Sequence, residues 1–182
     1  MHFFTADQHY GHANIIRFCN RPFASVQEMD RELIRRHNEV VGPDDTVIHA
    51  GDFAYRNSRA PQSYLEELNG HHILVRGSHD RWLDATAREI LELEIEGQPL
   101  VVCHYAMRTW PRSHYGSWQL HGHSHGTLEP LGKQWDVGVD HNDFTPVSFA
   151  RLMEIMAGRP DNPGMVTGGS GGRGRLGGGS AT

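Results

Sequence analysis

The sequence predicts an α/β fold with its functional residues at the carboxyl ends of the strands. Three successive units in the first half of the chain each read as an apolar strand, a cluster of Asp, His and Gly, and a helix. Such alternation is typical of sheets that bind ligands beyond the ends of their strands. A later stretch, His121-Gly122-His123-Ser124-His125, carries three imidazoles in five residues. Imidazoles so placed are poor core material and suit a transition-metal site, although a solvated turn is the alternative.

Composition limits the class of protein. A chain of 182 residues with 37% apolar and 21% charged content fits one globular domain with a core of its own. Its only cysteines, Cys19 and Cys103, exclude a disulfide scaffold and are expected to be reduced. No signal peptide is recognisable, and no run approaches the ~18 apolar residues of a membrane helix, so we expect a cytoplasmic protein. The net charge of −5 argues against a broadly basic surface for nucleic acid.

The first predicted strand runs from His2 to Ala6 and delivers Asp7 and His9 just beyond its end. Alternate residues of an extended chain point the same way, so this carboxylate and this imidazole could chelate one ion. A solvated turn is the plainer interpretation of an isolated Asp-x-His. A short helix from His12 to Cys19 should follow, and Arg21 near its exit could meet phosphate oxygens or simply be solvated.

A second unit begins with the capping box Ser25-Val26-Gln27-Glu28 and a helix that should end near Gly42-Pro43. The β-branched strand from Thr46 to Ala50 then runs into Gly51-Asp52. Asp52 sits where a single carboxylate could bridge two ions, although most Gly-Asp pairs at strand ends are turns.

The third unit comprises a helix from Pro61 to Leu68, ended by Gly70, and an apolar strand from His72 to Arg76. We expect that strand to lie in the core of the sheet. It ends on Gly77-Ser78-His79-Asp80, a further cluster of polar side chains.

A hairpin follows, because Leu91 to Ile95 alternate with glutamates and Gly97-Gln98-Pro99 turns the chain back into Leu100 to Cys103. Its second strand ends on His104. The loop after it contains Arg108, Trp110 and Trp118, which could stack a base and clamp a phosphate. Packing of the two tryptophans against the sheet, as part of a lid, is the alternative.

The last elements are a strand from Asp136 to Asp140 and a helix from Pro146 to Ala157, capped by Thr145. The globular domain is therefore expected to span residues 1–157. Residues 158–182 are rich in Gly, Ser and Arg, and we expect them to be disordered. The segment Arg173-Gly174-Arg175 could touch RNA loosely, but a linker is the simpler interpretation.

Five blocks of polar residues follow one another over about residues 1 to 140: Asp7-x-His9, Gly51-Asp52, Gly77-Ser78-His79-Asp80, His104 and Gly122-His123-x-His125. In their identity and order they resemble the motifs of the calcineurin-like metallophosphoesterases. The resemblance implies two mixed β-sheets packed as a sandwich and flanked by helices, with two metal ions at the strand ends. By the same resemblance, one ion would be held by Asp7, His9 and His125, the other by His104 and His123, with Asp52 bridging both. His79 would be the acid beside the leaving group and Asp80 its orienting partner.

The resemblance also implies a reaction. Two cations roughly 3.5 to 4 Å apart lower the pKa of a shared water, and the hydroxide attacks phosphorus in line. Mixed oxygen and nitrogen ligands favour Mn, Fe or Zn, and Ni is also compatible. We therefore expect hydrolysis of a small phosphate ester, either a phosphodiester, with cyclic nucleotides among the candidates, or a phosphomonoester. RNA and nucleotides are the other ligands considered.

Two alternatives belong to other classes. Some proteins that resemble this family look like protein-binding scaffolds, a role that would require the metal sites to have decayed. A metallohydrolase of the β-lactamase fold would need an H-x-H-x-D-H run, which is absent. Ser78 is the one departure, because the family has Asn there; we expect a second metal site that is weaker by ~10 to 100-fold, unless Ser78 only caps the turn.

Overall fold

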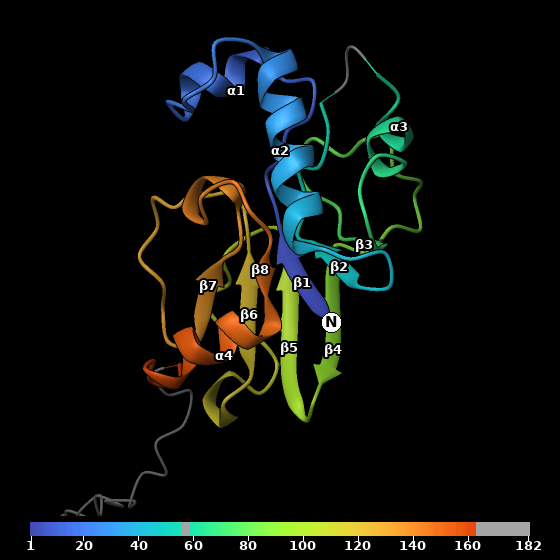
Figure 1. Ribbon diagram of the computed structural model, residues 1–182. Coiled ribbons are helices and arrows are strands. Elements are labelled where there is room, and N and C mark those ends of the chain that lie inside the picture. The colour runs from blue at the N-terminus through green and yellow to red at the C-terminus, as the bar shows by residue number, and fades with distance from the viewer. Residues whose placement is uncertain (56–58, 163–182) are drawn as a thin grey trace, which may run out of the picture.

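The computed structural model describes residues 1–55 and 59–162 and consists of two four-stranded mixed sheets with helices (Figure 1). The first sheet has the order β3-β2-β1-β8, formed by His71–Leu74, Thr46–His49, His2–Thr5 and Val147–Ser148. Strands β1, β2 and β3 are parallel, and β8 is antiparallel to β1. The second has the order β4-β5-β6-β7, formed by Ile90–Ile95, Gln98–Cys103, Trp118–His121 and Gln134–Asp136. This confirms the predicted fold class.

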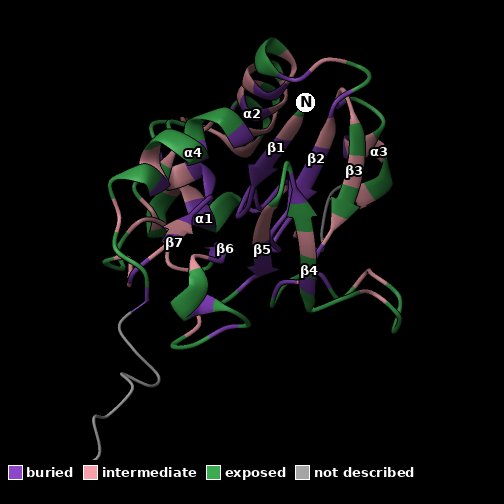
Figure 2. Ribbon diagram, turned by 90° about the horizontal axis from the view of Figure 1, so that it is seen from below, coloured by how far each residue is buried: buried purple, intermediate pink, exposed green. Residues whose placement is uncertain are grey.

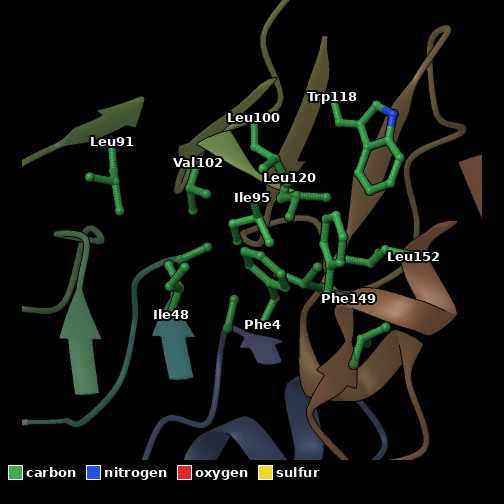
Figure 3. Close-up of a cluster of buried hydrophobic side chains, with 14 of the residues drawn as sticks. Phe4, Ile48, Leu91, Ile95, Leu100, Val102, Trp118, Leu120, Phe149 and Leu152 are labelled. Atoms are coloured by element: carbon green, nitrogen blue, oxygen red, sulfur yellow. The ribbon is translucent and has the colours of Figure 1, made fainter. Parts of the chain in front are cut away.

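The two sheets face each other across one apolar core (Figure 3). Phe4 of β1 and Ile48 of β2 lie opposite Leu100 and Leu120 of the second sheet, and all four are almost completely buried. Side chains alternate along a strand, so the neighbours of Phe4 and Ile48 point to the opposite face of the first sheet. Helix α4 (Phe149–Ala157) contributes further apolar side chains to this core.

Helices α2 (Val26–Val40) and α3 (Pro61–Leu65) pack on the other face of the first sheet, and α1 (Ala13–Phe18) lies beyond the strand ends, in the same apolar cluster as α2 (Figure 1). Helix α2 begins as predicted, since the Ser25 side chain accepts a hydrogen bond from the Glu28 backbone N–H. Met29 and Leu33 of this helix are buried, whereas Val40 at its last position is 38% exposed. Figure 2 shows the buried side of α2 turned toward β1 and β2.

The outer face of the second sheet is covered by a loop, residues 104–117, that contains the 3-10 helix η1 (Ser113–Tyr115). Two glutamines on this face are buried, and Gln134 donates to the side chain of Gln119. The amide of Gln119 in turn bonds the Met107 N–H and the Tyr105 carbonyl. These polar contacts hold the loop against the second sheet, whereas helices cover the outer face of the first sheet.

Three predicted elements are wrong in position. Strand β3 is an edge strand and not a core strand, because it pairs only with β2 and Ile73 is 42% exposed. The late strand ends at Asp136, and Val139–His141 form a 3-10 helix instead. The last helix begins at Phe149 with Ser148 as its cap, because Val147 is paired with Phe4 in the sheet. Strand β6 was not predicted as a strand.

The predicted disorder from Gly158 onward is wrong for its first residues. Arg159 donates to the carbonyls of Pro130 and Gly132, and Asn162 is 6% exposed. Residues 163–182, which include Arg173 and Arg175, lie outside the described residues. Within the described part of the chain, no helix is both long and apolar enough to cross a membrane.

Candidate metal centre

Side chains from four separate loops meet where the strands of both sheets end. Asp7 and His9 follow β1, Asp52 follows β2, His104 follows β5, and the loop after β6 carries the two remaining histidines, His123 and His125. They form two groups able to hold a metal ion. The first group is Asp7, His9 and His125, and the second group is Asp52, His104 and His123; within each, the ligand atoms lie within 4.8 Å of one another.

One carboxylate oxygen lies between the two groups. Oδ2 of Asp52 is 3.6 Å from Nε2 of His9, in the first group, and 3.3 Å from Nε2 of His104, in the second. A single oxygen at such distances from both imidazoles is in the place of a bridging ligand.

Three polar atoms at this centre are buried without a hydrogen-bond partner: Oδ1 of Asp7, Nε2 of His9 and Nε2 of His104. The three residues are at most 2% exposed. Burial raises the pKa of Asp7 to about 7, since a carboxylate is poorly solvated there. Leaving such groups unpaired costs about 1–3 kcal/mol each, and cations between them would satisfy all three. The residues present therefore fit divalent metal ions.

In His104 and His125, a hydrogen bond at Nδ1 leaves Nε2 free to bind a metal ion. Nδ1 of His104 is 3.0 Å from the carbonyl of Ala50, and Nδ1 of His125 is 2.7 Å from Oδ2 of Asp140. Carbonyl and carboxylate oxygens only accept, so each Nδ1 carries the proton. Each Nε2 then presents a lone pair, as metal-bound histidines do.

The backbone is unusual at most of these residues. Five of the six have positive φ: Asp7 (58°), His9 (51°), Asp52 (54°), His123 (66°) and His125 (47°). This left-handed region is uncommon outside glycine, and its occurrence in a cluster marks strained functional loops. Gly122 allows the loops to approach, because a Cβ there would lie 2.6 Å from Oδ2 of Asp7.

Comparison with known proteins agrees with this architecture. The uncharacterised protein MJ1445 of Methanocaldococcus jannaschii is 31% identical over 163 residues, which cover 85% of this chain and 90% of that protein. A crystal structure of the Aquifex aeolicus protein AQ665, of unknown function, has a TM-score of 0.67 at 23% identity and covers 85% and 98% of the two chains. No family model matches.

A predicted phosphoesterase of Streptococcus pneumoniae is more distant, with a TM-score of 0.43 and 18% identity over 75% of this chain and 70% of that one. In this chain the five sequence blocks meet at one centre built on two mixed sheets. Because MJ1445 is 31% identical over most of both chains, this chain belongs to the same family as that protein.

Asp80 does not do what the sequence suggested. Its buried carboxylate accepts hydrogen bonds from the backbone N–H groups of Asp52, Phe53 and Gly77 and from the indole of Trp82. These donors occupy both oxygens and tie the loop after β2 to the loop after β3. The predicted role of Asp80 as orienting partner of His79 is therefore wrong, and Asp80 instead holds the backbone of Asp52.

The side chain of His79 is 39% exposed and faces the centre, with Nε2 3.9 Å from Oδ2 of Asp52. It also forms a third possible metal group with His9 and Asp52. Ser78 donates its hydroxyl to Asp52, at 3.0 Å from Oδ2 and 3.3 Å from Oδ1. Ser78 therefore contacts the second group by its hydrogen bonds to Asp52. Its role as a metal ligand stays a prediction.

One side chain at the centre was not assigned to it from the sequence, and one histidine of the His-rich stretch lies outside the metal groups. His12, expected only as the start of a helix, lies with Nδ1 3.3 Å from Nδ1 of His9 and stacks on Tyr55 at 4.0 Å between ring centroids. Its spacing three residues after His9 was the available signal. His121, the first imidazole of the His-rich stretch, is buried at the end of β6 and belongs to none of the groups found among the described residues.

Most of the predicted substrate contacts are wrong. Trp118 lies in β6 and packs in the core against Phe149, and Trp110 is 6% exposed with its indole bonded to the Ser117 carbonyl. Arg21 is buried under the metal centre and paired with Asp140. Arg108 is exposed, and its contact with substrate stays a prediction. The aromatic residue of this loop that borders the centre is Tyr105, 48% exposed and edge-on to His104 and His123.

Proposed function

We propose that this protein is a dinuclear metal-dependent phosphoesterase that hydrolyses small phosphodiesters, with cyclic nucleotides among the candidates, or phosphomonoesters. The observation that carries the proposal is the shared oxygen of Asp52, which lies between two complete three-residue groups. Two metal ions about 3.5 to 4 Å apart are the arrangement used by many enzymes that displace groups at phosphorus.

In this proposal, Asp7, His9 and His125 would hold one ion, and Asp52, His104 and His123 the other. Their mixed carboxylate and imidazole donors suit Mn, Fe or Zn, and Ni is compatible. When bound, the two ions would neutralise charge on the phosphate oxygens and lower the pKa of a water molecule.

His79 is the candidate proton donor to the leaving group. Its side chain is the most accessible of the imidazoles facing Asp52 Oδ2, and its backbone N–H is fixed by a 2.8 Å bond to Oδ1 of Asp52. A positioned general acid contributes about 10²- to 10⁴-fold, and most to esters with poor leaving groups. Tyr105, which lies beside the second group, is the candidate contact for the organic part of a substrate.

The deciding experiment is metal reconstitution. The protein is stripped with EDTA, reloaded separately with Mn, Zn, Fe or Ni, and assayed with bis-p-nitrophenyl phosphate and p-nitrophenyl phosphate. We expect no activity without metal and recovery with at least one of them. The substrate class then follows from a screen of 2',3'- and 3',5'-cyclic nucleotides, nucleoside monophosphates and sugar phosphates. Absence of hydrolysis under every metal would refute the proposal.

His79→Asn separates the acid role from a ligand role. A general acid predicts unchanged Mn stoichiometry, a large loss of activity on alkyl esters, and a smaller loss on p-nitrophenyl esters, whose leaving group needs little protonation. Loss of bound metal would assign His79 to the third group instead.

A non-catalytic scaffold of the same fold is the alternative, and metal content distinguishes it: fewer than one ion per chain after Mn loading would favour it. The cytoplasmic location expected from the sequence, and any contact with RNA, stay predictions.

A further inference from the structure

The guanidinium of Arg21 lies fully buried beneath the first group, and all five of its N–H donors have acceptors. Nε and one Nη2 donor bind the carboxylate of Asp140, at 2.8 and 2.7 Å. The other Nη2 donor binds the Asp7 carbonyl at 2.6 Å, and Nη1 binds the Gln8 carbonyl at 3.0 Å and the sulfur of Met29. Only arginine supplies five donors in a fixed plane, so lysine could not satisfy this set.

Asp140 links Arg21 to a third residue, His125. Its Oδ2, already bound by Arg21, is also 2.7 Å from Nδ1 of His125. Because a carboxylate only accepts, it holds the proton of His125 on Nδ1 and leaves Nε2 free to face Asp7 and His9. The two carbonyls that Arg21 binds belong to the segment in which Asp7 and His9 have positive φ, a backbone that persists only when the surroundings hold it.

We infer that Arg21 and Asp140 are positioning residues that act as one unit on the first group. Arg21 holds the strained segment that carries Asp7 and His9, and Asp140 selects the tautomer and orientation of His125. The inference rests on the proposed function only in that a metal ion occupies the first group.

The same contacts exclude a different use of Asp140. Cys19, His125 and Asp140 also come within 4.8 Å of one another and form a fourth possible metal group. Both oxygens of Asp140 are taken by Arg21, and the guanidinium charge opposes a cation at that place. Nδ1 of His125, on the side of Cys19 and Asp140, therefore orients the ring. Nε2, on the side of Asp7, is the nitrogen that would bind a metal ion.

The first test uses the unmodified, metal-free protein at alkaline pH, where the ring of His125 is neutral. Nitrogen-15 NMR distinguishes the two neutral tautomers of an imidazole, and we expect His125 as the Nδ1–H form. The same experiment on Asp140→Asn should show a shift toward the Nε2–H form, because the amide has only one oxygen for the three N–H groups of Arg21 and His125, and its NH2 group can donate to Nδ1 of His125. A wild-type His125 in the Nε2–H form would overturn the inference, whether or not any variant folds.

The second test is Mn binding without substrate, by calorimetry on Asp140→Asn and Arg21→Lys. Nitrogen-15 NMR signals of His125 and His104 during a parallel titration with diamagnetic Zn report which group each ion occupies. We expect binding at the first group to weaken by ~10 to 100-fold, the usual effect of removing a partner of a metal-bound histidine, with the second group unchanged. Equal weakening of both groups, or none, would contradict the inference.

Arg159→Lys is the matched control, because Arg159 also binds two backbone carbonyls but lies away from the metal ligands. It should leave both Mn affinities as in the wild type. These readouts need no turnover, so an inactive protein that shows the expected tautomer and metal affinities would refute the phosphoesterase proposal and leave this inference standing.

Discussion

A buried histidine far from the metal centre should make the fold sensitive to acid. His37 of α2 is 3% exposed, and its Nε2 is 2.9 Å from the carbonyl of Asn69, which requires a proton on that nitrogen. Burial lowers the pKa of His37 from 6.5 to about 4, and the ring of His72, 5.7 Å away, acts in the same direction. The neighbouring His49 also has a lowered pKa because of its burial.

The direction follows from proton uptake by the two states. Below pH 6.5 the unfolded chain binds a proton at residue 37, whereas the folded protein does not until the pH approaches 4. The stability contributed by a neutral His37 is complete above pH 6.5 and is lost as the pH falls toward 4. That interval, at about 1.36 kcal/mol per pH unit, corresponds to about 3 kcal/mol.

The assay is urea unfolding of the EDTA-treated protein and of His37→Gln at a series of pH values, followed by tryptophan fluorescence. Gln keeps a donor for the Asn69 carbonyl but cannot take up a proton. We expect the stability of the variant to fall by about 3 kcal/mol less than that of the wild type between pH 7 and 4. A constant offset between the two curves would show that His37 does not cause the loss.

Further outcomes follow from the same structure. Trp118→Ala should lower the free energy of unfolding by about 3–5 kcal/mol in urea titrations and leave KM unchanged, because Trp118 is a core residue. Tyr105→Ala should raise KM for nucleotides more than for p-nitrophenyl esters in steady-state kinetics, and equal effects would show that the ring is structural. Ser78→Asn should tighten Mn binding at the second group in calorimetry and raise turnover at limiting metal; unchanged affinities would remove residue 78 from the metal shell. Asp80→Asn should lower the free energy of unfolding by on the order of 3 kcal/mol, because one amide oxygen cannot accept from four buried donors. A variant of normal stability that lost only activity would restore Asp80 as the partner of His79.

Elements whose signal is local were predictable from the sequence. The runs that form β1, β2 and β5 are rich in aromatic or β-branched residues because most of their side chains are buried on both faces of a sheet. The Ser25 cap and the Gly97 turn were recognisable for the same reason, since their hydrogen bonds and backbone angles involve neighbours in the chain.

Elements that depend on distant partners were placed incorrectly. Trp118 was assigned to the loop after His104 because β6 is short and mixes Gln and His with its apolar residues. Its status as a strand comes from pairing with β5 and β7. In the same way, Val147 looked like the first turn of a helix until its pairing with Phe4 made it a strand.

The sequence by itself determined which residues could form the metal centre, because chemistry-bearing side chains recur directly after apolar strands in the order of a known family. Only the tertiary structure decided what each residue does there. Arg21 and Asp140 are 119 residues apart, and Asp80 is 28 residues from the backbone N–H of Asp52 that it binds. No local pattern encodes such contacts, because they exist only once the two sheets have packed and brought the strand ends together.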